Sequence, residues 1–106
     1  MAMNKLLISL GLAAGLVSGS AMADLALAQK SGCLACHSVE KKIVGPAWRD
    51  VGKKYKGDAG AKARLVAKVK AGGKGVWGSA PMPPYSPRVA DENIEKLVTF
   101  VLSLGE

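Results

Sequence analysis

The feature that most constrains this chain is the segment KSGCLACHSVEKK, residues 30–42, which holds both cysteines and the only histidine. Cys33, Cys36 and His37 fall within five consecutive positions. Three kinds of chemistry compete for such a segment: a redox-active dithiol, half of a metal site, or a covalent attachment point for a large prosthetic group. Each makes a different demand on the remaining residues.

The order C-x-x-C-H favours attachment of a c-type haem over the other two possibilities. A thioredoxin-like dithiol belongs beside alternating strands and helices, and no strand pattern is found in this sequence. A zinc site needs about four ligands, which two thiols and one imidazole do not supply. Neither alternative explains why His37 directly follows Cys36. We therefore predict one haem c, bound covalently through Cys33 and Cys36, with His37 as the proximal iron ligand.

The first 23 residues have the layout of a secretory signal peptide. Lys5 precedes an apolar run over residues 6–17, and Ala21 and Ala23 frame the end of the segment. The run is shorter than the roughly 20 apolar residues that a membrane span needs. We predict cleavage after Ala23, export to the periplasm, no stable membrane anchor, and one domain over residues 24–106.

Charge and length narrow the function of that domain. The leader holds one of the fifteen basic residues and none of the eight acidic ones, so residues 24–106 carry a net charge of +6. This excess predicts salt-sensitive association with an anionic partner or surface. No recognition helix or basic–aromatic alternation is found, so no nucleic-acid partner is expected. A domain this short commonly needs a staple or a prosthetic group to complete its core.

Met82 is the only methionine outside the leader, in the segment VWGSAPMPPYSP. The flanking prolines Pro81, Pro83 and Pro84 predict a stiff loop that is neither helix nor strand. A lone methionine is often core filler, but a braced thioether also suits the distal position of an electron-transfer haem. We predict Met82 as the distal ligand and a one-electron carrier. The alternative is a haem enzyme or sensor, peroxidase-like or gas-binding, with an open or displaceable distal site.

Helical signals recur along the rest of the domain and predict an all-α fold of about four helices around the haem. Asp24 is expected to cap a first helix that continues into the haem motif. Pro46 suits the first position of a second helix. Asp58 is expected to cap a third, which stops at Gly72–Gly73, and Asp91 to open an apolar last helix.

Taken together, these segments resemble small bacterial monohaem class I cytochromes c of the cytochrome c-551/c-552 type. The resemblance covers residues 24–106 and rests on GCLACH, VGPAWRDVGKKY, GVWG, PMPPY and FVLSL, in that order. It implies that the Pro46 carbonyl accepts a hydrogen bond from His37 and that Trp77 donates one to a haem propionate. It also implies that Lys68 lies near that propionate and that Gly32 lets the first helix cross close to Phe100.

The same resemblance implies a monomeric electron shuttle of the periplasm and not an enzyme. Its redox partners would be a membrane quinol–cytochrome c oxidoreductase as donor and a terminal oxidase, nitrite reductase or peroxidase as acceptor. One haem edge would reach the surface among apolar residues, with lysines at its rim. The apolar residues are Leu34, Ala35, Ile43, Pro83 and Pro84, and the lysines are Lys30, Lys41, Lys42 and Lys74.

Overall fold

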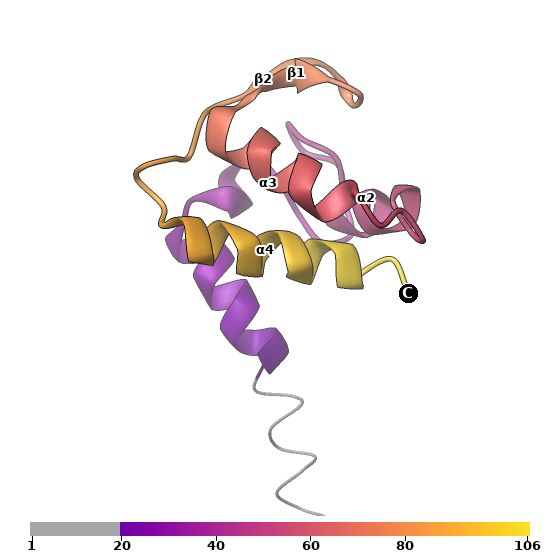
Figure 1. Cartoon of the computed structure of the whole chain (residues 1–106), viewed down its shortest axis with the longest axis horizontal. Coiled ribbons are helices and arrows are strands. Elements are labelled where there is room, and N and C mark those ends of the chain that lie inside the picture. The colour runs from indigo at the N-terminus through magenta and orange to yellow at the C-terminus, as the bar shows by residue number, and fades with distance from the viewer. Residues whose placement is uncertain (1–19) are drawn as a thin grey trace, which may run out of the picture.

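The computed structural model describes residues 20–106, which fold as packed helices with a short hairpin at one edge (Figure 1). The predicted leader lies outside the described residues except for its last four positions. In chain order the elements are a helix over residues 20–30, the 3₁₀ helix η1 (Cys33–Ala35), α2 (Trp48–Lys54), α3 (Ala61–Ala71), β1 (Gly73–Gly75), β2 (Gly78–Met82) and α4 (Asp91–Ser103). Within residues 20–106, no helix is both long enough and apolar enough to cross a lipid bilayer.

Helix α4 is the element on which the rest of the core is built. It begins at Asp91, as predicted, and packs against both α2 and α3. Its apolar residues recur with the helical period, so that Ile94, Leu97, Val98 and Phe100 are all buried. Ile94 has no exposed surface at all.

The buried residues form two clusters that divide α4 between them. One cluster joins Ala28 of the N-terminal helix, Cys33 and Trp48 to the side of α4 that carries Leu97 and Phe100. The other packs the segment after the hairpin, including Tyr85, and apolar residues of α3 against Ile94 and Val98. The chain therefore builds two small cores, and the functional site is lined by residues from both.

A two-stranded antiparallel sheet interrupts the otherwise helical chain. Strand β1 pairs with β2 so that Gly73 lies opposite Met82 and Gly75 opposite Gly78. The predictions that no strand occurs and that Met82 lies in a loop are therefore wrong. Pro81 is tolerated because both strands of a two-stranded sheet are edges, where a missing N–H need not break a ladder. The strands were not predicted because they are rich in glycine and proline, which do not give the alternating apolar pattern of a strand.

Two helices begin later than the sequence predicted. Helix α2 begins at Trp48 and not at Pro46, whose carbonyl is used elsewhere. Helix α3 begins at Ala61, with Gly60 rather than Asp58 at the N-cap position. The Asp58 carboxylate still accepts a hydrogen bond from a backbone N–H of this turn, that of Gly60 at 3.0 Å. It caps the turn before the helix instead of the helix itself.

The N-terminal helix also differs at both ends from its prediction. It already includes residues 20–23, so Asp24 lies within it and does not cap it. It ends at residue 30 instead of continuing into the haem motif, because Gly32 has a positive φ of 86° that a helix cannot contain. A Cβ on Gly32 would meet only a guanidinium nitrogen of Arg88, at 3.9 Å. Gly32 is therefore needed for its backbone conformation, and not for a close approach to Phe100.

The close crossing lies just beyond the C-terminal end of α4, between Gly52 of α2 and Gly105. A Cβ on Gly52 would lie 2.5 Å from the backbone nitrogen of Gly105 and 2.8 Å from the carbonyl oxygen of Val101. These are backbone atoms, which cannot swing aside as the end of a side chain can. The absence of a side chain at position 52 thus sets how closely α2 and α4 approach.

We predict that Gly52→Ala lowers the free energy of unfolding of the haem-loaded protein by about 1–3 kcal/mol, the usual cost of overpacking. The better helix propensity of alanine offsets no more than about 1 kcal/mol of this loss. Guanidinium chloride unfolding followed by circular dichroism measures the difference. Gly60→Ala is the matched control, because its Cβ would first meet the movable guanidinium group of Arg64. Equal stability of the two variants would contradict the close crossing.

Candidate haem site

A cavity of about 390 Å³ brings together residues from the C-x-x-C-H segment, the hairpin and three helices. Cys33, Cys36, His37 and Met82 all line it. Most of the remaining lining is apolar. Helices α2, α3 and α4 contribute Val51, Leu65, Val69, Leu97 and Val98, and the hairpin covers another side. Its size lies within the range of about 300–1,000 Å³ that is usual for ligand and cofactor sites.

The C-x-x-C-H segment enters the cavity as a tight turn. Its backbone N–H groups at Cys36 and His37 both donate to the Cys33 carbonyl oxygen, at 3.2 and 3.0 Å. Both cysteines are free thiols. Burial raises the pKa of the Cys33 thiol, although a backbone hydrogen bond and the Arg88 guanidinium partly oppose the rise. Redox dithiols need the opposite shift, so this environment does not favour the dithiol alternative.

The His37 ring is held from three directions. Its Nδ1 lies 2.9 Å from the Pro46 carbonyl oxygen. A carbonyl only accepts, so Nδ1 carries the proton and Nε2 keeps its lone pair for a metal. The ring stacks on Trp48, with centroids 5.6 Å apart. On another side, a Cβ on Gly45 would lie 2.4 Å from the His37 Cε1. The imidazole therefore has little freedom to tilt.

Met82 reaches the cavity as the last residue of β2. It is half-buried and packs against the core cluster that contains Ile94. Its partner across the sheet, Gly73, follows α3 after a single residue, so strand pairing connects Met82 to the end of that helix. The sequence predicted that prolines brace this thioether, whereas the structure adds a hydrogen-bonded hairpin.

Trp77 and Lys68 lie at the hairpin side of the cavity. Trp77 is in the turn between β1 and β2 and is 40% exposed. The Lys54 ammonium lies 5.9 Å from the centroid of its ring. The Lys68 ammonium donates a hydrogen bond of 2.8 Å to the Lys74 carbonyl oxygen. The structure thus places all seven predicted site residues around one cavity: Cys33, Cys36, His37, Pro46, Lys68, Trp77 and Met82.

Sequence reasoning did not assign site roles to Gly45, Trp48 or Tyr55. Gly45 and Trp48 contact the His37 ring from outside the C-x-x-C-H segment, and Tyr55 lines the cavity from the end of α2. The contact of Gly45 with His37 could have been suspected from the Gly-Pro pair at positions 45 and 46, because glycine often occurs where a backbone passes close to another group. Nothing in the spacing distinguished Trp48 from an ordinary core residue.

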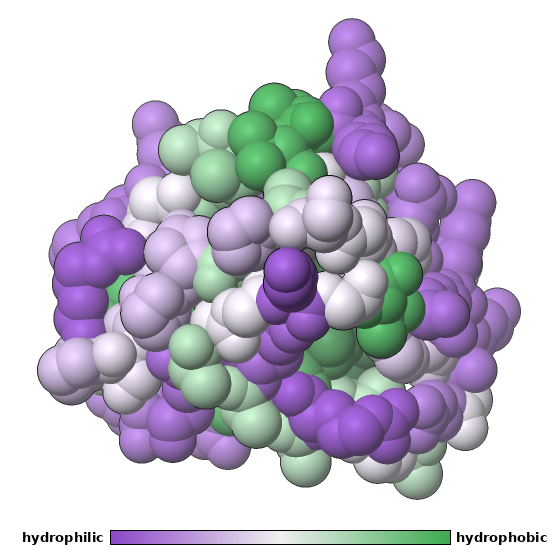
Figure 2. Space-filling view, turned by 90° about the horizontal axis from the view of Figure 1, so that it is seen from above, coloured by the Kyte–Doolittle hydropathy of each residue, from purple (hydrophilic) through white to green (hydrophobic). Residues whose placement is uncertain are grey.

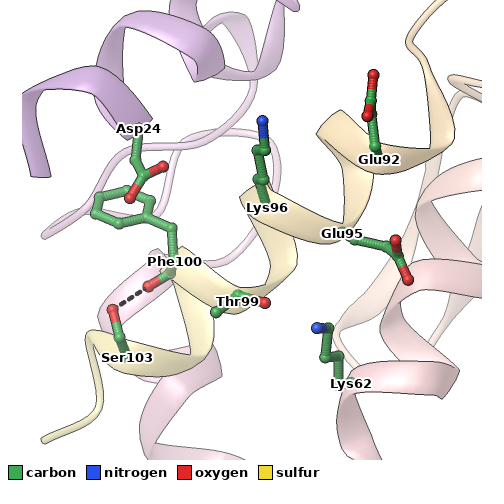
Figure 3. A pocket seen from close by; sticks show the side chains of 8 residues that line it. All are labelled: Asp24, Lys62, Glu92, Glu95, Lys96, Thr99, Phe100 and Ser103. Carbon is green, nitrogen blue, oxygen red and sulfur yellow. Dashed lines mark hydrogen bonds between the residues drawn. The ribbon is translucent and has the colours of Figure 1, made fainter. Parts of the chain in front are cut away.

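A second depression, of about 550 Å³, lies over α4 and contains none of the predicted site residues. Figure 3 shows its charged groups, with Glu92, Glu95 and Lys96 projecting from α4 and Lys62 across from them. These carboxylates and ammonium groups have mixed sign, and no thiol, imidazole or thioether accompanies them. The chemistry of a haem site is therefore confined to the cavity lined by His37 and Met82.

The fold and this donor set match known proteins. The family model for cytochrome c matches residues 25–105, and the chain therefore belongs to the cytochrome c family. It is 61% identical to cytochrome c-551 of Allochromatium vinosum over 83% of this chain and 93% of the relative. It is 46% identical to cytochrome c-552 of Nitrosomonas europaea, over 84% of this chain and 85% of that one.

Solved structures agree with the sequence relatives. The crystal structure of wild-type cytochrome c552 of Nitrosomonas europaea superposes with a TM-score of 0.71 at 44% identity and covers 76% of this chain and 98% of its own. The class 1 cytochrome MtoD of Sideroxydans lithotrophicus gives a TM-score of 0.69 at 32% identity, covering 79% and 95%. The predicted class I cytochrome c fold and the resemblance to the c-551/c-552 type are confirmed, and these relatives are small cytochromes c rather than enzymes.

Family membership means that the protein carries one covalently bound haem c. The cavity fits that group. It offers two free thiols, an imidazole with one nitrogen kept for a metal, a thioether, and a largely apolar lining. Among residues 20–106, no cluster of three or more His, Cys, Asp or Glu side chains could hold a bare metal ion. The donor set is that of an iron macrocycle and not of zinc.

We predict that the chain cannot keep this fold without haem. Without haem, the apolar lining of a cavity of about 390 Å³ would be exposed to water. A chain this short has little other core to offset that exposure. Cys33→Ala combined with Cys36→Ala should therefore give no stable helical protein, as measured by circular dichroism. Ser38→Ala, beside the same motif, is the control and should yield normal holoprotein. A well-folded double variant lacking haem would contradict the prediction.

Proposed function

We propose that the protein is a periplasmic one-electron carrier whose haem iron is ligated by His37 and Met82. The observation that carries the proposal is that both side chains line one cavity together with the two attachment cysteines. A haem c with two filled axial positions supplies reversible one-electron transfer between Fe(III) and Fe(II). The protein's part is to hold the ligands, exclude water and present the site to partners.

His37 and Met82 have complementary roles in this proposal. The hydrogen bond from Nδ1 to the Pro46 carbonyl fixes the tautomer and increases the electron donation of His37. Met82 is a neutral, soft ligand that favours the ferrous state and raises the reduction potential. His37 lies in the turn that follows η1, and Met82 lies in a paired strand, so the backbone of both is restrained. Little rearrangement should therefore accompany a change in the oxidation state of the iron.

Trp77 and Lys68 are proposed to bind the haem propionates. Both lie at the hairpin side of the cavity. An indole N–H and an ammonium group are donors suited to carboxylates. The two propionates would be the only charged groups at the edge of the haem that this largely apolar cavity has to accommodate.

The rival reading, an enzyme or sensor with an open distal site, has less support. The only histidine is committed to the Pro46 carbonyl on one nitrogen and faces the cavity with the other. No second imidazole is therefore left to move protons for a bound substrate. The half-buried Met82 thioether is also already packed against the core, as a permanent ligand should be.

Localisation and partners are proposed as follows. Residues 1–23 act as a signal peptide cleaved after Ala23, and the mature monomer shuttles electrons in the periplasm. A membrane quinol–cytochrome c oxidoreductase is the donor, and a terminal oxidase, nitrite reductase or peroxidase is the acceptor. The A-x-A sequence at Ala21–Ala23 and the relatives' shared fold support this proposal.

Three substitutions test the ligand role of Met82. Met82→Leu keeps the side-chain volume but removes sulfur, so the ferric protein should lose its near-infrared sulfur-to-iron band and bind azide. Met82→His should stay six-coordinate and lower the midpoint potential by more than about 100 mV, within the wide range set by axial ligands. Val66→Ala, on the partly buried side of α3, is the control and should keep the band. Parent-like spectra and potential in Met82→Leu would exclude Met82 as the ligand.

The processing site has a direct test. Protein recovered from the periplasm should begin at Asp24, as read by N-terminal sequencing or intact mass. Ala23→Asp should block cleavage, because the peptidase site requires a small residue there. A mature N-terminus elsewhere, or full-length protein in the periplasm, would overturn the proposed boundary while leaving the haem site unaffected.

A further inference from the structure

Charge is distributed very unevenly along this chain. Residues 51–90 contain nine lysines and arginines but one acidic residue, Asp58. Residues 91–106 show the reverse, with four acidic residues and the single base Lys96. In Figure 1, α3 and the hairpin form the upper part of the molecule and α4 runs below them. The excess positive charge is therefore gathered around the hairpin and the helices beside it.

Little of this positive charge is neutralised within the molecule. Asp58 is paired with Arg64, and Lys70 with Asp91 across to α4. Within residues 20–106, Lys54 and Lys74 are in no ion pair, and both are exposed. Lys68 donates to the neutral Lys74 carbonyl, and its charge is reserved for the proposed propionate contact. Lys54 and Lys74 therefore remain as the uncompensated cations beside the hairpin.

The turn itself presents apolar surface between those cations. Val76 is 70% exposed and Trp77 is 40% exposed. The Lys54 ammonium lies near the ring centroids of both Trp77 and Tyr55, at 5.9 and 5.8 Å. Figure 2 looks onto the hairpin side, where small green apolar areas are bordered by purple hydrophilic side chains. We call Lys54, Lys74, Val76 and Trp77 the hairpin surface.

Trp77 connects this surface to the cavity. Its ring is partly exposed to solvent, and it also lines the cavity that contains His37 and Met82. A partner in contact with the hairpin surface would therefore be separated from the site by one aromatic side chain. Val76 and Lys74 line the same wall, so the approach is short across the whole hairpin surface.

We propose that the hairpin surface is a docking site for the acidic face of a redox partner protein. The inference rests on the proposed function as an electron carrier. Unpaired cations around a small apolar centre are the arrangement that steers an acidic partner and releases it quickly. One electron passes between the partner's reduced centre and the ferric haem, so that one is oxidised and the other reduced, with no atom or proton transferred.

A protein partner fits this surface better than a lipid bilayer. Insertion into a membrane would require Trp77 to leave its contact with Lys54, and only Val76 projects freely enough to enter an apolar phase. The surface is also distinct from the exposed pair Ile43 and Val44, each 53% exposed, near His37. Val44 and Val76 both line the cavity, so the pair Ile43 and Val44 is a second exposed apolar approach to the site.

The experiment compares charge reversals of equal size on the two sides. The probe is a reduced plant-type ferredoxin, an acidic one-electron donor, and its reduction of the ferric protein is followed by stopped flow from 0.01 to 0.15 M salt. The variants are Lys54→Glu with Lys74→Glu on the hairpin surface, and Lys41→Glu with Lys42→Glu beside Ile43. Val76→Asp is paired with Val76→Thr as its neutral control. A neutral hydroquinone serves as a second reductant for every variant.

The Lys54/Lys74 pair should slow reduction by ferredoxin by about tenfold or more at 0.01 M salt, within the range known for steering. The defect should shrink toward 0.15 M, where the Debye length is about 8 Å. The Lys41/Lys42 pair should lose less than about threefold under the same conditions. Val76→Asp should remain slower than Val76→Thr at every salt concentration, because it alters the apolar centre.

A defect in the Lys41/Lys42 pair that equals or exceeds that of the Lys54/Lys74 pair would overturn the proposal. Binding of phosphatidylglycerol vesicles through Val76, with unchanged ferredoxin kinetics, would also overturn it. The rate with hydroquinone distinguishes failure of the docking proposal from failure of the proposed function. A variant that also reacts slowly with the neutral reductant, or that loses the sulfur-to-iron band, has a damaged haem site. Unchanged hydroquinone rates with unchanged ferredoxin rates reject the hairpin surface alone.

Discussion

The fold depends on one constraint: the chain has no single continuous core, and its buried residues form two separate clusters. One cluster is organised by Trp48 and Phe100, whose rings meet edge to face at 6.2 Å, and the other by Ile94 of the same helix. Helix α4 alone spans both. A prosthetic group attached through Cys33 and Cys36 therefore serves the fold as well as electron transfer, since it supplies apolar volume that so short a chain lacks.

The two proposed ligands, His37 and Met82, are held largely by the surrounding backbone. The imidazole of His37 is limited by the Pro46 carbonyl, by Trp48 and by the bare backbone at Gly45. Met82 is limited by strand pairing to Gly73. Around this restrained centre the charges are arranged freely, with carboxylates along α4 and cations on α3 and the hairpin. The buried residues thus restrain the proposed iron ligands, and the surface charges affect which proteins can bind.

The sequence was most informative where chemistry requires fixed spacing. The C-x-x-C-H motif, the single methionine outside the leader and the apolar period of α4 all pointed to residues that line or support one cavity. Helix starts were less predictable, because Pro46 and Asp58 satisfy the usual signals while the backbone turns before each helix. The hairpin was missed for a related reason: Gly73, Gly75 and Gly78 have positive φ values of 117°, 149° and 123°, and no strand pattern describes such residues. The contact between Gly45 and His37 depends on tertiary packing, which single-sequence periodicity does not report.

The pairing of β1 with β2 has a consequence for how this segment can vary. Successive residues of a strand point to opposite faces, so a shift of one residue in register turns every side chain to the other side. The register of this sheet already shifts between the pair Gly73–Met82 and the pair Gly75–Gly78. Surface turns usually tolerate changes of length. Here the side chains of the turn can be exchanged during evolution or design, and its length can change only where the pairing of Gly73 with Met82 is kept.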